Sequence, residues 1–239
     1  SNSGKTKDKP VLTLDKALEL AGEGGTIYLC GTSGFSINTE VTLGNDITFK
    51  TESEATSSTI FNVSDGGHLI VNNVTFDGGK GEKDRKYIAS SPINVTDLGK
   101  LTVNPGAKFT KCYSAISVMP VGIEATNYNA GNAEVTINGG EFYDLGVDKD
   151  TANAVHYHGV ISIDSVSKKY KAIVNINDIN IHDCVTSNGL ITVGGYGDES
   201  NVICNMRGGT ITNNTLVTNA EWSTPVVAKV QGQFNMSGG

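Results

Sequence analysis

The 239-residue chain has only one tryptophan, five prolines and four cysteines, and it contains no apolar run of the length that a membrane span requires. The cysteines form no CxxC pair, which excludes the common zinc and redox motifs. Acidic residues outnumber basic ones, and the net charge is -7. Such a chain lacks the basic surface that nucleic acid or an anionic membrane needs, so we expect no nucleic-acid partner and no membrane insertion.

Glycine is abundant, with 29 residues, as are Asn and Thr, and this composition favours tight turns between strands. A short pattern built on such turns keeps returning: a β-branched strand, an Asn or Gly turn and a second short strand. A strand unit repeated at a period of this size predicts a β-helix, a solenoid made of strands. The anchor residues of the pattern lie 32, 34, 39, 30 and 30 positions apart, at Val71, Val103, Ile137, Ile176, Met206 and Met236.

Each coil is expected to contain three strands. The first strand alternates strictly, as in Ile116-Ser-Val, which places its apolar residues on the inner face and its polar residues on the outer face. The second strand carries the anchor residue, and the third follows the turn, as in Glu141-Phe-Tyr. Thr26–Cys30 is interpreted as an early first strand. The expected inner residues of the other first strands are Phe61, Val63, Ile93, Val95, Ile116, Val118, Ile161, Ile163, Ile191 and Val193.

Asparagine occupies one register of the turn between the second and third strands. Because an Asn amide can bond the same amide one coil away, this register predicts a structural Asn ladder. The ladder positions are Asn72, Asn104, Asn138 and Asn177.

The N-terminal segment, residues 1–25, is expected to contain a short amphipathic helix that begins after Thr13 and ends at Gly22. Such a helix would cover the open end of the first coil, as solenoids require. Residues 26–239 then form the β-helix, of about seven coils. Because Met236-Ser-Gly-Gly stops inside a repeat, we expect the chain to be part of a larger polypeptide.

A helix, then Gly24-Gly-Thr-Ile-Tyr-Leu, then coils with Asn or Gly turns, resembles the pectate-lyase-like right-handed parallel β-helix superfamily. The resemblance is greatest to β-helical regions of surface proteins and secreted carbohydrate-active proteins of Gram-positive bacteria. It implies an all-β, right-handed parallel β-helix with three sheets, an extracellular location, and a substrate groove along the outer face of the first strands. The clustered Asp and nearby Arg or Lys of a pectate lyase are missing from that face.

The coil between Ile116 and Ile161 is the longest, with 45 residues against 23 in the coil before it. Its loops, 121–133 and 145–158, are the candidate site, because long loops on a rigid scaffold often carry function. A converging carboxylate and imidazole could perform acid/base chemistry, and two carboxylates could cleave a glycosidic bond. The candidate catalytic residues are Asp164, His158, His156, Glu124 and Asp144, and Asp148 and Asp150 lie in the same loops.

Flat aromatic side chains in the loops are candidate sugar contacts, namely Trp222, Tyr128, Tyr157 and Tyr196. His156-x-His158 with Asp164 could hold Zn²⁺, but the chain has no HExxH pattern, and we expect no metal and no cofactor. The cysteines are expected to be buried free thiols, with a Cys184–Cys204 disulfide as the alternative.

Two functions from different classes remain open. The first is a glycan-binding or matrix-binding β-helix module of a bacterial surface adhesin, favoured by the regular Asn, Ser and Thr residues of the outer face. The second is a glycan-cleaving enzyme, a hydrolase or a lyase, favoured by the uneven loops. A third, purely structural spacer needs no site.

Overall fold

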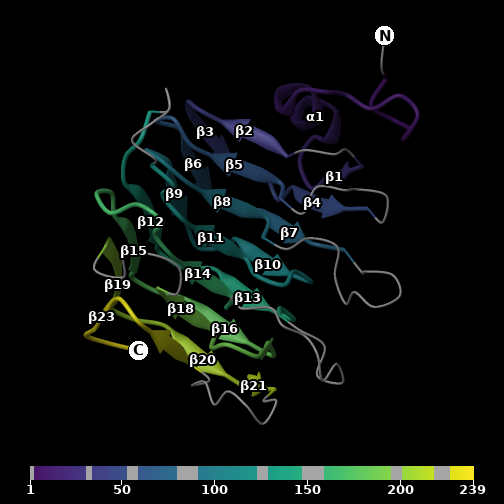
Figure 1. Ribbon diagram of the computed structural model, residues 1–239. Helices are drawn as coiled ribbons and strands as arrows, with labels where there is room; N and C mark the ends of the chain where they lie inside the picture. Colours follow the sequence, from purple (N-terminus) through teal and green to yellow (C-terminus); the bar gives the residue numbers. More distant parts are fainter. Residues whose placement is uncertain are drawn as a thin grey trace.

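In the computed structural model, the described part of the chain forms a parallel β-helix whose three main sheets contain seven strands each. Figure 1 shows the strands of successive coils stacked along one axis. The structure describes residues 3–30, 34–52, 59–79, 91–122, 129–146, 159–194, 201–217 and 227–239. Strands from successive coils stack in order along the axis, and neighbouring strands run parallel. The predicted fold class is therefore confirmed.

The first sheet contains the strands that open the coils. They are β2 (Phe35–Ile37), β5 (Phe61–Val63), β8 (Ile93–Val95), β11 (Ile116–Val118), β14 (Ile161–Ile163), β18 (Ile191–Val193) and β22 (Ala228–Val230). The predicted inner residues of this sheet are all buried, as strict alternation requires.

The second sheet carries the anchor residues, which pair with one another in the predicted register from Val71 to Met236. Its strands are β3 (Glu40–Leu43), β6 (His68–Val71), β9 (Lys100–Val103), β12 (Ala133–Ile137), β15 (Ala172–Ile176), β19 (Val202–Met206) and β23 (Gln233–Met236).

The third sheet follows the Asn or Gly turns. Its strands are β1 (Thr26–Leu29), β4 (Thr48–Thr51), β7 (Thr75–Asp77), β10 (Lys108–Thr110), β13 (Glu141–Tyr143), β16 (Asn180–His182) and β20 (Thr210–Thr212). β17 (Val185–Thr186) and β21 (Thr215–Leu216) form an additional two-stranded parallel sheet beyond it, which the sequence pattern did not predict.

The interpretation of Thr26–Cys30 as a first strand was wrong. β1 pairs with β4, and Ile27 lies beside Phe49 in the third sheet. The early member of the first sheet is instead β2, where Phe35 pairs with Phe61. The alternating pattern of Thr26–Leu29 suits either sheet, so only its partner strand could decide between them.

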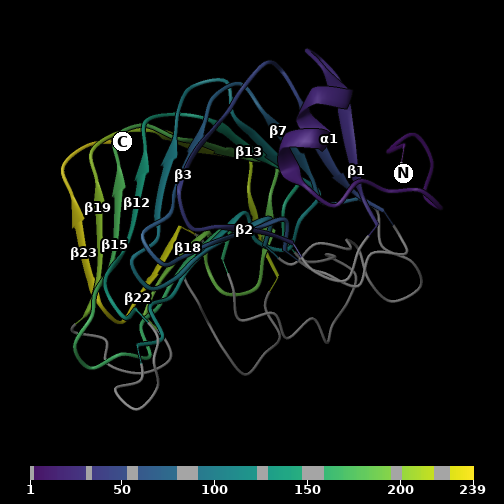
Figure 2. The same cartoon turned by 90° about the horizontal axis from the view of Figure 1, so that it is seen from above.

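Helix α1 (Leu14–Ala21) lies over β1 at the N-terminal end of the solenoid, as Figure 2 shows. Thr13 caps it, because its side-chain oxygen accepts a hydrogen bond from the backbone N–H of Lys16 at 3.4 Å. Gly22 ends the helix with a positive φ of 66°, which glycine adopts readily, and its N–H donates to the Leu18 carbonyl oxygen. The helix packs Leu14 and Leu18 against the core, which confirms the predicted cap.

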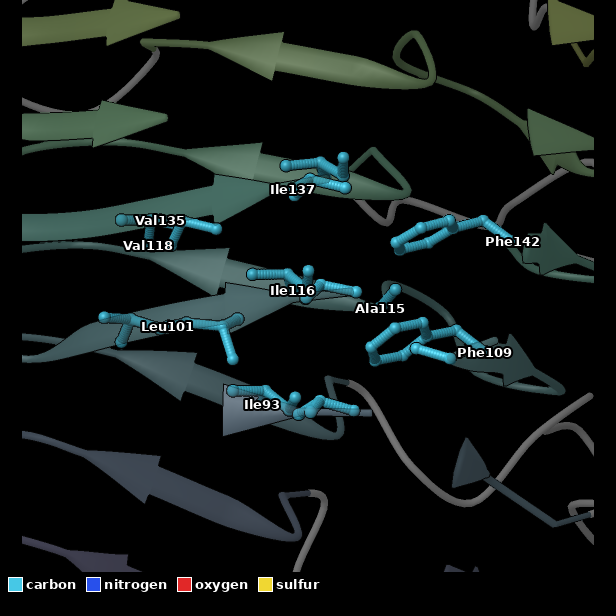
Figure 3. Close-up of a cluster of buried hydrophobic side chains, with 14 of the residues drawn as sticks. Ile93, Leu101, Phe109, Ala115, Ile116, Val118, Val135, Ile137 and Phe142 are labelled. Carbon is cyan, nitrogen blue, oxygen red and sulfur yellow. The ribbon is translucent and has the colours of Figure 1, made fainter. Parts of the chain in front are cut away.

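The core is a continuous apolar column between the three sheets (Figure 3). On the third-sheet side, Phe76 stacks on Phe109 at a centroid distance of 4.8 Å, and Phe109 stacks on Phe142 at 4.7 Å. The rings are nearly parallel and fully buried. Burying a ring of this size contributes about 1.5–3 kcal/mol, so the Phe column is a main source of stability.

Candidate functional site

Most of the site residues expected from the sequence lie outside the described residues. These are Glu124, Tyr128, Asp148, Asp150, His156, Tyr157, His158, Tyr196 and Trp222. Asp164 and Asp144 are described. Asp164 follows β14 of the first sheet, and Asp144 follows β13 of the third sheet.

Asp164, one of the candidate catalytic residues, is buried, with 8% of its surface exposed. Its Oδ1 accepts a hydrogen bond from the backbone N–H of Ser165 at 2.8 Å. Ser162 and Thr192, which belong to the outer row of the same sheet, are buried as well, and the Thr192 hydroxyl lies 3.3 Å from that of Ser162. The outer face of the first sheet is therefore covered at β14 and β18, whereas Ser117 on β11 is half-buried.

Asp144 adopts a left-handed backbone conformation, at φ 50°. Its carbonyl oxygen accepts a hydrogen bond from the backbone N–H of Lys111 at 3.0 Å. Lys111 and Asp183, which follow β10 and β16, also have positive φ. Asp144 is thus one member of a column of turn residues that ends the third-sheet strands.

An open groove of about 420 Å³ lies where the second sheet turns into the third. It spans the turns before β10, β13 and β16 and reaches the start of β20, so it follows the helix axis across four coils. Its lining residues are Pro105, Gly106, Ala107, Lys108, Gly139, Gly140, Glu141, Asp178, Ile179, Asn180 and Thr210.

The groove arises from a difference between two neighbouring turns. The turn before β10 has one residue more than the turn before β13, and Gly106 within it has φ 89°. The turn before β13 consists of Asn138, Gly139 and Gly140, and the two glycines have no side chains. A Cβ atom at Gly139 would lie 3.0 Å from the Pro105 ring. The longer turn therefore lies beside a stretch of backbone that has no side chains, and this difference in height forms the groove.

The rim of the groove carries groups that both donate and accept hydrogen bonds. The Lys108 ammonium lies 3.8 Å from Glu141 Oε2. The Thr210 hydroxyl donates to Asn180 Oδ1 at 2.9 Å, and the Asn180 amide group itself carries two N–H donors. Asp178 is exposed, and its Oδ1 accepts a hydrogen bond from the Ile179 N–H at 3.0 Å.

Glu141 also belongs to a second group, which we call the His182 cluster: Glu141, Tyr143, His182 and Asp183. His182 Nε2 lies 3.1 Å from Glu141 Oε1, and its Nδ1 lies 2.7 Å from Asp183 Oδ2. The imidazole stacks on the Tyr143 ring at 5.5 Å with the planes 6° apart. Both ring nitrogens are therefore engaged by carboxylates, and one ring face is covered.

The hydrogen bond to Asp183, followed by that to Glu141, raises the pKa of His182 above its ordinary value. The hydrogen bonds from His182 and then from Asn213 lower the pKa of Asp183. The His182–Asp183 pair is therefore fully charged between the lowered pKa of the acid and the raised pKa of the imidazole. Its stabilising effect is lost as the pH rises through the His182 pKa or falls through the Asp183 pKa.

Asp178, His182 and Asp183 were not among the candidate site residues expected from the sequence. His182 is connected to the groove by Glu141, which is 41 residues from His182 along the chain. The two residues lie on neighbouring strands, because Glu141 pairs with Asn180 and Tyr143 pairs with His182. The sequence contained this information, because aligning the third strands in register places Glu141 and His182 on adjacent strands. The unequal turns before β10 and β13 are likewise visible in the sequence.

The cysteines are free, so the alternative disulfide does not form. Burial raises the pKa of Cys204 to about 12, which keeps this thiol protonated and unreactive. Among the described residues, no three His, Cys, Asp or Glu side chains are arranged to hold a metal ion. Nor does the described part of the chain contain a helix long and apolar enough to cross a membrane.

Comparisons with protein-family models, with curated proteins and with solved structures find no significant match for this chain.

Proposed function

We propose that this chain is a glycan-binding β-helix module of a bacterial surface or secreted, adhesin-like protein, and that the groove beside β10, β13, β16 and β20 is its binding site. The observation that carries this proposal is the groove's extent across four coils. Neighbouring strands are about 4.8 Å apart, so the groove presents one polar side chain per coil, from Lys108, Glu141, Asn180 and Thr210, at regular steps along the axis. A linear polymer of repeating units, such as a polysaccharide, suits that arrangement.

The chemistry of the rim suits a glycan and disfavours a nucleic acid. Sugar hydroxyls both donate and accept hydrogen bonds, as do the Lys108, Asn180 and Thr210 groups taken together. The carboxylates of Glu141 and Asp178 and the chain's net charge of -7 disfavour a nucleic-acid backbone. The resemblance to the pectate-lyase-like superfamily supports the same class of ligand and an extracellular setting within a larger polypeptide.

Binding is favoured over cleavage by the state of the ionisable groups beside the groove. His182 has both nitrogens engaged by carboxylates, and Glu141 is shared between His182 and Lys108. A general acid or base needs a proton-transfer atom that the substrate can reach, whereas the described polar side-chain contacts of His182, Glu141 and Lys108 are with one another and with Asp183. We therefore interpret these groups as fixing the side-chain positions and the charge distribution of the rim.

The test is a glycan array followed by calorimetry on the strongest hit, with Thr210→Arg as the blocking variant. Thr210 is exposed at the groove, so the longer side chain should obstruct the ligand without disturbing the core. We expect at least about a tenfold loss of affinity, equivalent to about 1.4 kcal/mol. Thr42→Arg is the matched control, because Thr42 is exposed on β3 of the second sheet and does not line the groove.

Two outcomes would overturn the proposal. If Thr210→Arg binds as tightly as the unmodified protein, the ligand does not use this groove. If the array glycan is shortened during the experiment, the chain is a glycan-cleaving enzyme, and the carboxylates and histidines of the long loops become the leading candidates.

A further inference from the structure

Glu141 connects the groove to the His182 cluster. Its side chain lines the groove, while its two oxygens are held by different cations, Oε1 by His182 at 3.1 Å and Oε2 by Lys108 at 3.8 Å. His182 does not line the groove. Any change in the charge of His182 therefore reaches the groove through Glu141.

We propose that His182 is a positioning residue that sets the charge and the rim of the groove according to pH. When protonated, it donates to Asp183 and to Glu141 at once and holds the Glu141 carboxylate against the sheet. The neutral ring has only one N–H. We place this proton on Nδ1, because the contact from Nδ1 to Asp183, at 2.7 Å, is the shorter of the two. Nε2 then presents a lone pair to Glu141 Oε1, and the carboxylate is released toward Lys108 and the groove.

The groups around the ring support this sequence of events. From β13 come Glu141 and the stacked Tyr143, and from the turn after β16 comes Asp183, which also accepts a hydrogen bond from Asn213. The neighbouring strand β20 contributes the neutral Thr212, which pairs with His182. Lys108 on β10 touches Glu141 and is the only cation in contact with that carboxylate, apart from His182, among the described residues.

The raised pKa of His182 is consistent with this arrangement and places the change on the alkaline side of an ordinary histidine, whose pKa is about 6.5. Loss of the proton lowers the net charge beside the groove by one unit and frees an acceptor that competes for Lys108. The affinity for a neutral glycan should therefore fall as the pH rises, and this expectation rests on the proposed function.

The first experiment needs no ligand. The ring resonances of His182 are followed by NMR as a function of pH and assigned with His182→Gln. We expect a midpoint above the ordinary histidine value, lowered by Asp183→Asn and, by a smaller amount, by Glu141→Gln. Glu134→Gln is the control, since Glu134 pairs with Lys100 on the second sheet and should leave the midpoint unchanged. A midpoint that Glu141→Gln does not move would overturn the coupling.

The second experiment measures the affinity for the array glycan at pH 5.5 and pH 8. We expect about a two- to fivefold loss at the higher pH, the size typical of an exposed charge pair, and no such loss in His182→Gln. An equal pH dependence in both proteins would overturn the inference. If the NMR midpoints behave as expected but no glycan binds, the His182–Glu141 coupling stands and the proposed glycan function fails.

Discussion

At the scale of single residues, the Asn ladder is the clearest structural device of the chain. Asn138 donates from Nδ2 to Asn104 Oδ1 at 2.9 Å and accepts at its own Oδ1 from Asn177 at 2.8 Å. Asn104 donates in the same way to Asn72. Each amide thus satisfies two neighbours, and Arg207 replaces the next amide by donating to Asn177. The predicted ladder is confirmed.

We expect Asn138→Ala to lower the free energy of unfolding by about 1–3 kcal/mol, because it removes one hydrogen bond on each side and leaves the half-buried Asn104 without its donor. Chemical denaturation followed by circular dichroism measures this change. Thr136→Ala on the same strand is the control, since Thr136 is half-buried on the outer face and does not belong to the ladder. Equal destabilisation by both substitutions would show that the ladder adds no stability.

At the scale of elements, each strand separates a core face from a solvent face. In β15, Ala172, Val174 and Ile176 are buried, whereas Ile173 is half-buried on the outer face despite being apolar. Hydrophobicity alone therefore does not decide the side, and the period of two does.

Ile176→Ala should cost about 2–5 kcal/mol through lost burial and the cavity that it leaves. Ile173→Ala, an identical change three residues earlier, should cost much less, because its outer position lets water fill the space. Thermal unfolding of the two variants compares them directly. Similar melting temperatures would mean that the assigned register of β15 is wrong.

At the scale of the whole molecule, each coil contacts mainly its two neighbours, so stability is expected to vary along the axis. The N-terminal coil is covered by α1, whereas the last coil has one strand neighbour in each sheet. Val230 and Met236 there are 45% and 57% exposed, while Met206 in the preceding coil is buried.

Hydrogen–deuterium exchange should follow this gradient. We expect the slowest exchange in β9, β12 and β15, and the fastest in β20, β22 and β23, because central strands have neighbours on both sides and end strands open without breaking the core. Mass spectrometry of peptides from each coil measures the rates. Uniform protection along the axis would indicate that the solenoid opens as one cooperative unit.

The sequence by itself determined the repeat, the sheet to which most strands belong, the inner residues, the Asn ladder and the capping helix. These features follow from periodicity, which is a local property: a period of two fixes the buried face, and the spacing of the anchors fixes the register. Ile137 and Ile176 could therefore be paired across 39 residues without any coordinates.

Only the tertiary structure decided what lies beside what on the outer surface. In the structure, Glu141 contacts His182, and the groove lies at Gly139 and Gly140. Asp164 is buried, and Thr26–Leu29 belongs to the third sheet. Each of these depends on how turns of unequal length align neighbouring coils, and on which segments cover a sheet. Strand register places Glu141 and His182 on adjacent strands, but periodicity does not show whether two outer side chains meet or whether another segment buries them.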